Sequence, residues 1–231
     1  MVRRAVVCVL LFILFAAPVQ GCIGARQAAM GWCGVAISDD ATASYWNPAA
    51  LVWAKDGFMY GSIWDSTDLA AKYGSFGFHY VDEWDKWYCR IGYGYQLNKN
   101  LAVGFNVGWA EYNNCYPPYN GPSADLSLIY RNGHFALGLL AQNIGNIRPE
   151  IAYSTEFVTL SAGIYDLLNV GSLRDFHVGV EIRPFPILAL RGGYNSDYED
   201  LIYGVAIKTS FLTLDYVRIE EVNCFSITCI F

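Results

Sequence analysis

The chain has 231 residues and a formal net charge of −6 at pH 7, which excludes the basic surface that nucleic-acid-binding proteins need. Hydrophobic residues make up 54% of the chain, yet beyond the N-terminal region no apolar run is long enough to cross a bilayer as a helix. This combination is typical of a protein that spreads its apolar residues over many short strands.

The first 21 residues have the pattern of a secretory signal peptide. Arg3 and Arg4 form a positive start, and an apolar stretch over residues 5–17 leads to small residues before Cys22. The stretch is shorter than the roughly 20 residues of a transmembrane helix. We therefore predict export and cleavage after residue 21, with an N-terminal anchor helix as the alternative.

Cysteines provide one candidate modification site. Cys22 stands at the first mature position, where the lipoprotein pathway attaches a lipid, although Gln20 departs from the usual residues two positions earlier. An ordinary cleavage site is the alternative interpretation. The other mature cysteines are odd in number and lack C-x-x-C spacing, so we predict no metal site and no cofactor, and the spacing assigns no disulfide.

Residues 22–56 lack sustained alternation and differ from the rest of the chain. Ser38-Asp39-Asp40 is a typical helix start, which predicts a short helix over residues 41–46. Asn47-Pro48 interrupts it, and residues 49–55 continue as a second short helical turn. We predict that this segment is a plug inside the lumen of a barrel or across its inner mouth, which either moves as a gate or only seals the barrel. The candidate plug or gate residues are Asp39, Asp40, Tyr45, Trp46, Asn47 and Pro48.

Residues 57–231 alternate between bulky apolar and small or polar side chains in strand-length pieces. A soluble sandwich also alternates, but aromatic residues recur near the strand ends, as in the girdles of membrane barrels, and the small polar face fits a narrow lumen. Alternation is clearest over residues 101–109, 135–142, 176–183, 188–195 and 203–208.

The last ten residues, Val222–Phe231, are apolar on one face and small or polar on the other. Because an open sheet edge in lipid would leave backbone groups without partners, this strand must pair with the first. We predict an all-β, antiparallel transmembrane barrel of about 12 to 14 strands in outer-membrane lipid. Phe231 is the predicted C-terminal signal for the barrel-assembly machinery.

Turns and loops separate the predicted strands. Tight turns are expected at residues 82–85, 97–100, 131–134 and 184–186, and longer loops at residues 113–123 and 143–154. A further strand within residues 167–173 would bring the count towards fourteen.

Charged residues fall on the small-residue face of the predicted strands and therefore point into the lumen. Such charges need partners in a medium of low dielectric constant, and Glu181 and Arg191 lie on neighbouring strands within reach of each other. The set either braces the barrel as a ladder of ion pairs or lines a ligand path. No Gly-x-Ser-x-Gly motif is present, and we predict no enzymatic activity. The predicted lumen lining is Arg90, Asp125, Arg131, His177, Glu181, Arg183, Arg191, Lys208 and Asp215.

Two regions carry a set of short motifs. The plug segment contains Gly24-Ala25-Arg26, Asp39-Asp40-Ala41 and Tyr45-Trp46-Asn47-Pro48-Ala49, and the carboxy-terminal half contains Gly179-Val180-Glu181 and Leu214-Asp215-Tyr216. Together they resemble a shortened member of the PorV/PorQ-type outer-membrane barrel family, which belongs to a FadL-like superfamily. Trp32 and Cys33 depart from the family pattern, which has Gly and Ala there.

The resemblance implies an outer-membrane protein of a Gram-negative-type bacterium. Our main hypothesis is a PorV-like accessory in protein export or surface attachment, of the type IX secretion kind, with secreted proteins or secretion components as partners. The first alternative is a FadL-like conduit for a hydrophobic small molecule, which predicts an apolar pocket near residues 45–51 and a gap in the wall. The second alternative is a purely structural barrel.

Overall fold

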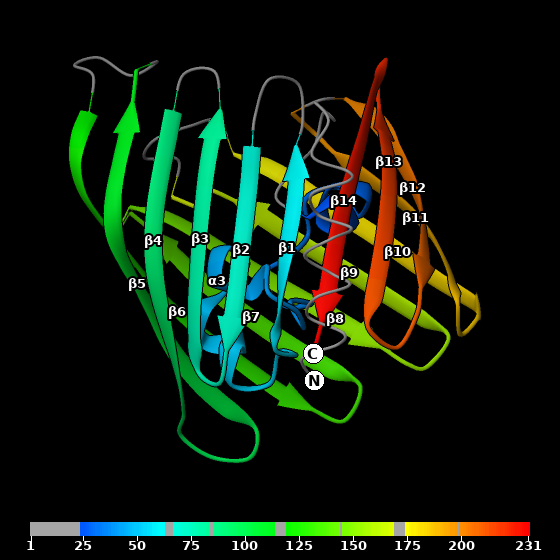
Figure 1. The fold of residues 1–231 in the computed structure, drawn as a ribbon, viewed down its shortest axis with the longest axis horizontal. Helices are drawn as coiled ribbons and strands as arrows, with labels where there is room; N and C mark the ends of the chain where they lie inside the picture. The colour runs from blue at the N-terminus through cyan, green and yellow to red at the C-terminus, as the bar shows by residue number, and fades with distance from the viewer. Residues whose placement is uncertain are drawn as a thin grey trace.

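The computed structural model describes residues 24–62, 67–83, 86–113, 119–143, 145–168, 174–197 and 199–231. Over these residues fourteen antiparallel strands close into a barrel, as the alternation predicts (Figure 1). The strands are β1 (Gly57–Ser62), β2 (Thr67–Tyr73), β3 (Phe76–Glu83), β4 (Lys86–Gln96), β5 (Leu101–Tyr112), β6 (Tyr119–Asn132), β7 (Phe135–Gln142), β8 (Asn146–Ser154), β9 (Val158–Tyr165), β10 (Asp175–Phe185), β11 (Leu188–Asn195), β12 (Asp200–Lys208), β13 (Leu212–Ile219) and β14 (Val222–Ile230).

Each strand pairs with its neighbour in sequence, and β14 closes the barrel against β1. Gly57 lies opposite Ile230, and Phe58 lies opposite Cys229. The backbone N–H of Phe231 donates to the carbonyl oxygen of Asp56 at 3.1 Å. The predicted pairing of the last strand with the first is therefore confirmed.

The two faces of the sheet differ as the alternation predicts. On β5, Phe105 and Val107 are 44% and 52% exposed, whereas Ala102, Asn106 and Ala110 are fully buried. Apolar side chains thus form the outer surface, and small or polar side chains point inward. In the described part of the chain, no helix has the length and apolar character that a membrane span requires.

Residues 24–56 fold inside the barrel (Figure 1). They form α2 (Ala25–Ala29), α3 (Ala43–Trp46) and the 3-10 helix η1 (Pro48–Val52). Helix α2 packs on β11 to β14, and η1 packs on β4, β5 and β6. We call this segment the plug.

Wall glycines let the plug backbone lie directly against the strands. A Cβ atom on Gly104 of β5 would lie 2.2 Å from the backbone nitrogen of Ala49. A Cβ atom on Gly193 of β11 would lie 2.0 Å from the backbone nitrogen of Gly31. The small inner face is therefore largely a docking surface for the plug.

Several predicted boundaries were wrong. Residues 146–154, predicted as loop, form β8. Arg148 and Glu150 are buried on its inward face, and Pro149 pairs with Leu139 of β7 but lies before the first register pair with β9, which is Glu150 with Gly163. Strand β6 begins at Tyr119, inside the loop predicted over residues 113–123. The turn at residues 97–100 is confirmed, whereas at the other three predicted turns the strands run on to Glu83, Asn132 and Phe185.

One helix was not predicted, and several other expectations fall wholly or partly outside the described residues. Helix α2 was not predicted, since five residues are too few to show a helical period. Leu167 and Leu168 form a turn rather than a strand, and the rest of the strand predicted over residues 167–173 lies outside the described residues. The signal peptide and Cys22 also lie outside them.

Candidate functional site

The wall of the barrel has a free strand edge between β6 and β7. The last register pair between these strands is Leu126 with Ala141, whereas β6 continues to pair with β5 as far as Tyr119 with Tyr112. Among the residues that the structure describes, residues 119–125 of β6 therefore pair with β5 alone, and the β5–β6 hairpin extends past the end of β7 (Figure 1). Pro122 lies in this stretch, which is consistent with an edge because proline lacks the N–H that a central strand donates.

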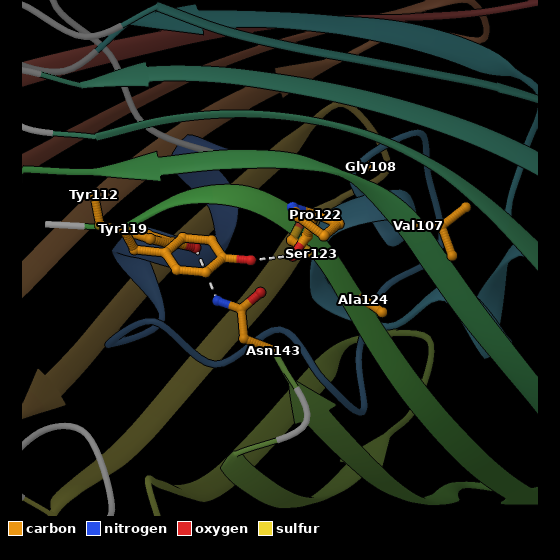
Figure 2. Close-up of a pocket in the computed structure, with 8 residues that line it drawn as sticks. All are labelled: Val107, Gly108, Tyr112, Tyr119, Pro122, Ser123, Ala124 and Asn143. Atoms are coloured by element: carbon orange, nitrogen blue, oxygen red, sulfur yellow. Dashed lines mark hydrogen bonds between the residues drawn. The ribbon is translucent and has the colours of Figure 1, made fainter.

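A pocket of about 670 Å³ lies at this edge (Figure 2). We call it the wall pocket. Its lining includes Val107 and Ala124 from the outward face of the sheet, and Gly108 and Ser123 from the inward face, so it spans the thickness of the wall. The lining residues are Val107, Gly108, Tyr112, Tyr119, Pro122, Ser123, Ala124 and Asn143.

A buried polar network borders the wall pocket. The guanidinium of Arg90 donates to Asp125 Oδ2 at 2.8 Å, to Ser123 Oγ at 3.0 Å and to Asn143 Oδ1 at 2.8 Å. Arg90 and Asp125 are almost completely buried, so the pair satisfies charges that would otherwise be costly. Two residues of the predicted lumen lining thus meet here and hold the inner side of β4 to β6.

Asn143 follows β7 and adopts a left-handed backbone with φ of 51°. Its backbone N–H donates to Asp125 Oδ1 at 2.9 Å, and its side-chain Nδ2 donates to the Tyr112 hydroxyl at 2.9 Å. Asn143 therefore ties the end of β7 to the hairpin that carries the wall pocket. It was not predicted as a site residue.

A row of aromatic rings leads from the wall pocket to the plug. Successive ring centroids are separated by 4.9 to 6.5 Å, distances at which aromatic pairs attract each other. Tyr88 and Tyr45 are nearly parallel, with an interplanar angle of 19°. We call this series the aromatic row; in order, it contains Tyr119, Tyr112, Tyr88, Tyr45, Trp46 and Trp32.

The predicted gate residues of the plug make mostly structural contacts. Asn47 caps η1 by accepting from the backbone N–H of Ala49 at 3.1 Å, and its Nδ2 donates to the carbonyl oxygen of Val35 at 2.7 Å. Pro48 is the first residue of η1, where its missing N–H costs nothing. Asp40 accepts from the backbone N–H of Thr42 at 2.8 Å, near the start of α3.

Glu150 of β8 holds the plug to the wall. Its carboxylate accepts from the backbone N–H groups of Gly34, Val35 and Ala36 at 2.8, 2.9 and 3.1 Å, and from Ser161 Oγ at 2.7 Å. Sequence reasoning missed Glu150 because it placed this segment in a loop. Burial, with Glu150 nearby, raises the pKa of the neighbouring Cys33 thiol well above its usual value.

A second anchor joins α2 to β10, β11 and β13. Glu181 accepts from Arg191 Nε at 2.7 Å, as their neighbouring positions predict, and from Arg26 Nε of the plug at 3.1 Å. Arg26 also pairs with Asp39 at 2.5 Å. Burial lowers the pKa of Arg26, but the two carboxylates outweigh burial and hold it above its usual value.

The remaining predicted lumen residues form ion pairs on the inner face of the wall or hydrogen bonds to the backbone of the plug. Arg183 pairs with Glu181 at 3.0 Å and Arg191 pairs with Asp215 at 2.5 Å, while Lys208 Nζ lies 3.7 Å from Glu181. Two further contacts are made to plug backbone, from Arg131 to Ser38 O and from His177 Nδ1 to Gly31 O. The predicted lining is therefore divided between the wall pocket and the plug anchors.

A second cavity, of about 100 Å³, adjoins the anchor around Arg26. Charged side chains, including Lys55, Arg191 and Asp215, provide much of its lining. Because an apolar molecule gains little from such a surface, the wall pocket and the aromatic row are the better candidate for a hydrophobic ligand.

No protein-family model and no curated protein matches the sequence, but solved structures match the fold. The toluene transporter TbuX of Ralstonia pickettii matches with a TM-score of 0.61 and 12% identity, over 93% of this chain and 99% of that chain. The CymD monoaromatic hydrocarbon channel matches with a TM-score of 0.61 and 11% identity, over 94% and 99%. A Pseudomonas aeruginosa FadL homologue matches with a TM-score of 0.56 and 10% identity, over 93% and 99%.

At these identities the likeness is one of fold. This chain shares the barrel fold of the three matched proteins, which are named as a toluene transporter, a monoaromatic hydrocarbon channel and a FadL homologue. The narrower PorV/PorQ assignment stays a prediction from the motifs.

Proposed function

We propose that this protein is a conduit for small hydrophobic molecules in the outer membrane of a Gram-negative-type bacterium. The observation that carries the proposal is the wall pocket at the free edge of β6, continued by the aromatic row to the plug. An apolar molecule enters or leaves the barrel sideways, through the wall pocket.

The chemistry of the path favours a compact, uncharged and aromatic molecule. The wall-pocket volume lies within the range of about 300–1,000 Å³ of small-molecule sites. Flat rings stack against the tyrosines of the aromatic row without needing hydrogen bonds. The fold likeness to TbuX, a toluene transporter, and to CymD, a monoaromatic hydrocarbon channel, supports the same class of molecule.

The packing of the plug supports a sideways path over an axial one. The plug backbone touches the wall where glycines leave no room, and Glu150 and Glu181 hold it at two separate places. Moving the plug as a body would break both anchors at once. Passage through the wall pocket requires no such movement.

Filling the wall pocket tests the proposal. Ala124→Trp places a large ring in the pocket, whereas Ala162→Trp places the same ring on the outer face of β9, away from it. Uptake of N-phenyl-1-naphthylamine, an aromatic probe that fluoresces on entering membranes, is measured in intact cells that display each variant. We expect Ala124→Trp to lower uptake to the level of cells without the protein, and Ala162→Trp to leave it unchanged. Equal uptake in both variants would contradict the proposal.

The PorV-like role in protein export is the second candidate, supported by the motif over residues 45–49. In the structure this motif seats and caps the plug, a task that a conduit and an export accessory share. Native mass spectrometry after gentle extraction separates the two roles. A bound exported protein would support the accessory role, and a bound small apolar molecule would support the conduit.

A further inference from the structure

Tyr112 stands between the wall pocket and the rest of the aromatic row. Its ring lines the wall pocket, and its centroid lies 6.1 Å from that of Tyr119 and 6.4 Å from that of Tyr88. A molecule that moves from the wall pocket towards the plug must pass this ring. The position of Tyr112 therefore decides whether the passage is open.

Asn143 and Arg90 both bind the hydroxyl of that ring: Asn143 Nδ2 donates to it at 2.9 Å, and Arg90 Nη2 donates to it at the longer distance of 3.3 Å. Figure 2 shows the Asn143 amide reaching the Tyr112 hydroxyl. The amide oxygen accepts from Arg90 Nη2 at 2.8 Å, so the side chain is oriented from both ends. The shorter of the two hydrogen bonds to the Tyr112 hydroxyl therefore comes from Asn143, which follows β7 rather than belonging to β4 or β5.

The contacts of Asn143 can break without disturbing the buried charges beneath. Asn143 is exposed, whereas Arg90 and Asp125 are buried and remain paired with each other, and Arg90 keeps its bond to Ser123, when the amide leaves. A rotation of the Asn143 side chain therefore breaks its hydrogen bonds to Arg90 and Tyr112 and leaves the Arg90–Asp125 pair in place.

We propose that Asn143 is the latch of this passage: it holds the Tyr112 ring across the inner end of the wall pocket, and its release admits a small apolar molecule to the aromatic row. The inference rests on the proposed conduit function. It assigns a positioning role to Asn143 and the gating role to the ring of Tyr112.

The test compares Asn143→Ala and Asn143→Gly with wild type in the N-phenyl-1-naphthylamine uptake assay. Both variants remove the amide group, but only glycine adopts the left-handed backbone of residue 143 without strain. Equal uptake in the two variants therefore shows that the lost amide, and not backbone strain, causes the change. Glu220→Ala is the matched control, a turn residue with φ of 52° between β13 and β14, away from the wall pocket. Tyr112→Phe keeps the ring and removes the hydroxyl that Asn143 and Arg90 both bind.

We expect uptake to rise about five- to thirtyfold in both Asn143 variants, the range for losing one or two net hydrogen bonds, and also to rise in Tyr112→Phe. Glu220→Ala should match wild type. Unchanged or slower uptake in folded Asn143 variants and in Tyr112→Phe, beside active wild type, would overturn the latch and leave the conduit standing. Uptake at background in wild type and in every variant would overturn the conduit and the latch together.

Discussion

Replacing Glu150 should release the middle of the plug from the wall. Glu150 Oε2 accepts from the N–H groups of Gly34 and Val35, and Oε1 accepts from Ala36 and Ser161. Glutamine keeps only one acceptor oxygen and turns an NH₂ group towards a backbone N–H. Since one hydrogen bond to a charged group contributes about 1.5–3 kcal/mol, Glu150→Gln should ease local opening by about ten- to hundredfold.

Hydrogen exchange measures this opening directly. We expect amide protection over residues 30–40 to fall by that factor in Glu150→Gln and further in Glu150→Ala, which loses all the acceptors. Glu199→Gln, a change at an exposed turn residue, should leave the same peptide unaffected. Equal protection in wild type and both Glu150 variants would refute the conclusion that this carboxylate anchors the plug.

Three further outcomes test the packing and charge arguments. The Cys33 thiol, fully buried and with a raised pKa, should react with a maleimide far more slowly in the folded barrel than after unfolding, and equal rates would show that the plug is open. Glu181→Ala removes one of the two carboxylate partners of Arg26 and of Arg191. The loss of these two charged hydrogen bonds should destabilise the barrel by about 3–5 kcal/mol in denaturant titrations, whereas Lys208→Ala, which removes a 3.7 Å contact, should cost about 1 kcal/mol or less. Gly104→Val should prevent the plug from docking, because the new Cβ atom would lie 2.2 Å from the plug backbone. The undocked plug should then be cleaved by added protease. Gly192→Ala, whose new Cβ atom would have its nearest neighbour at 3.7 Å, should resist the protease like wild type.

The architecture was largely predictable because alternation is visible in each strand by itself, and because an open sheet edge in lipid requires the barrel to close. Each piece from Leu101 onward carries a two-residue period, and the apolar face of Val222–Phe231 requires a partner in lipid. Glu181 and Arg191 could be paired because a short turn places their strands side by side.

The wall pocket could not be predicted in the same way. It exists because β7 ends at Gln142 while β6 extends to Tyr119, and that difference depends on the register of Leu126 with Ala141. Alternation along β6 is the same whether or not a neighbour is present. The loop assigned around Asn143 also hid both the latch and Glu150, because polar residues and a proline in a short strand look like a loop in sequence.

The most direct test of the conduit is the position of a bound apolar aromatic molecule. Bromobenzene is diffused into crystals of the protein, and the anomalous scattering of bromine locates it. The proposed function predicts bromine in the wall pocket beside Tyr112 and Tyr119, with a weaker position along the aromatic row. Bromine found only on the outer surface of the barrel, with the wall pocket empty at saturating bromobenzene, would contradict it.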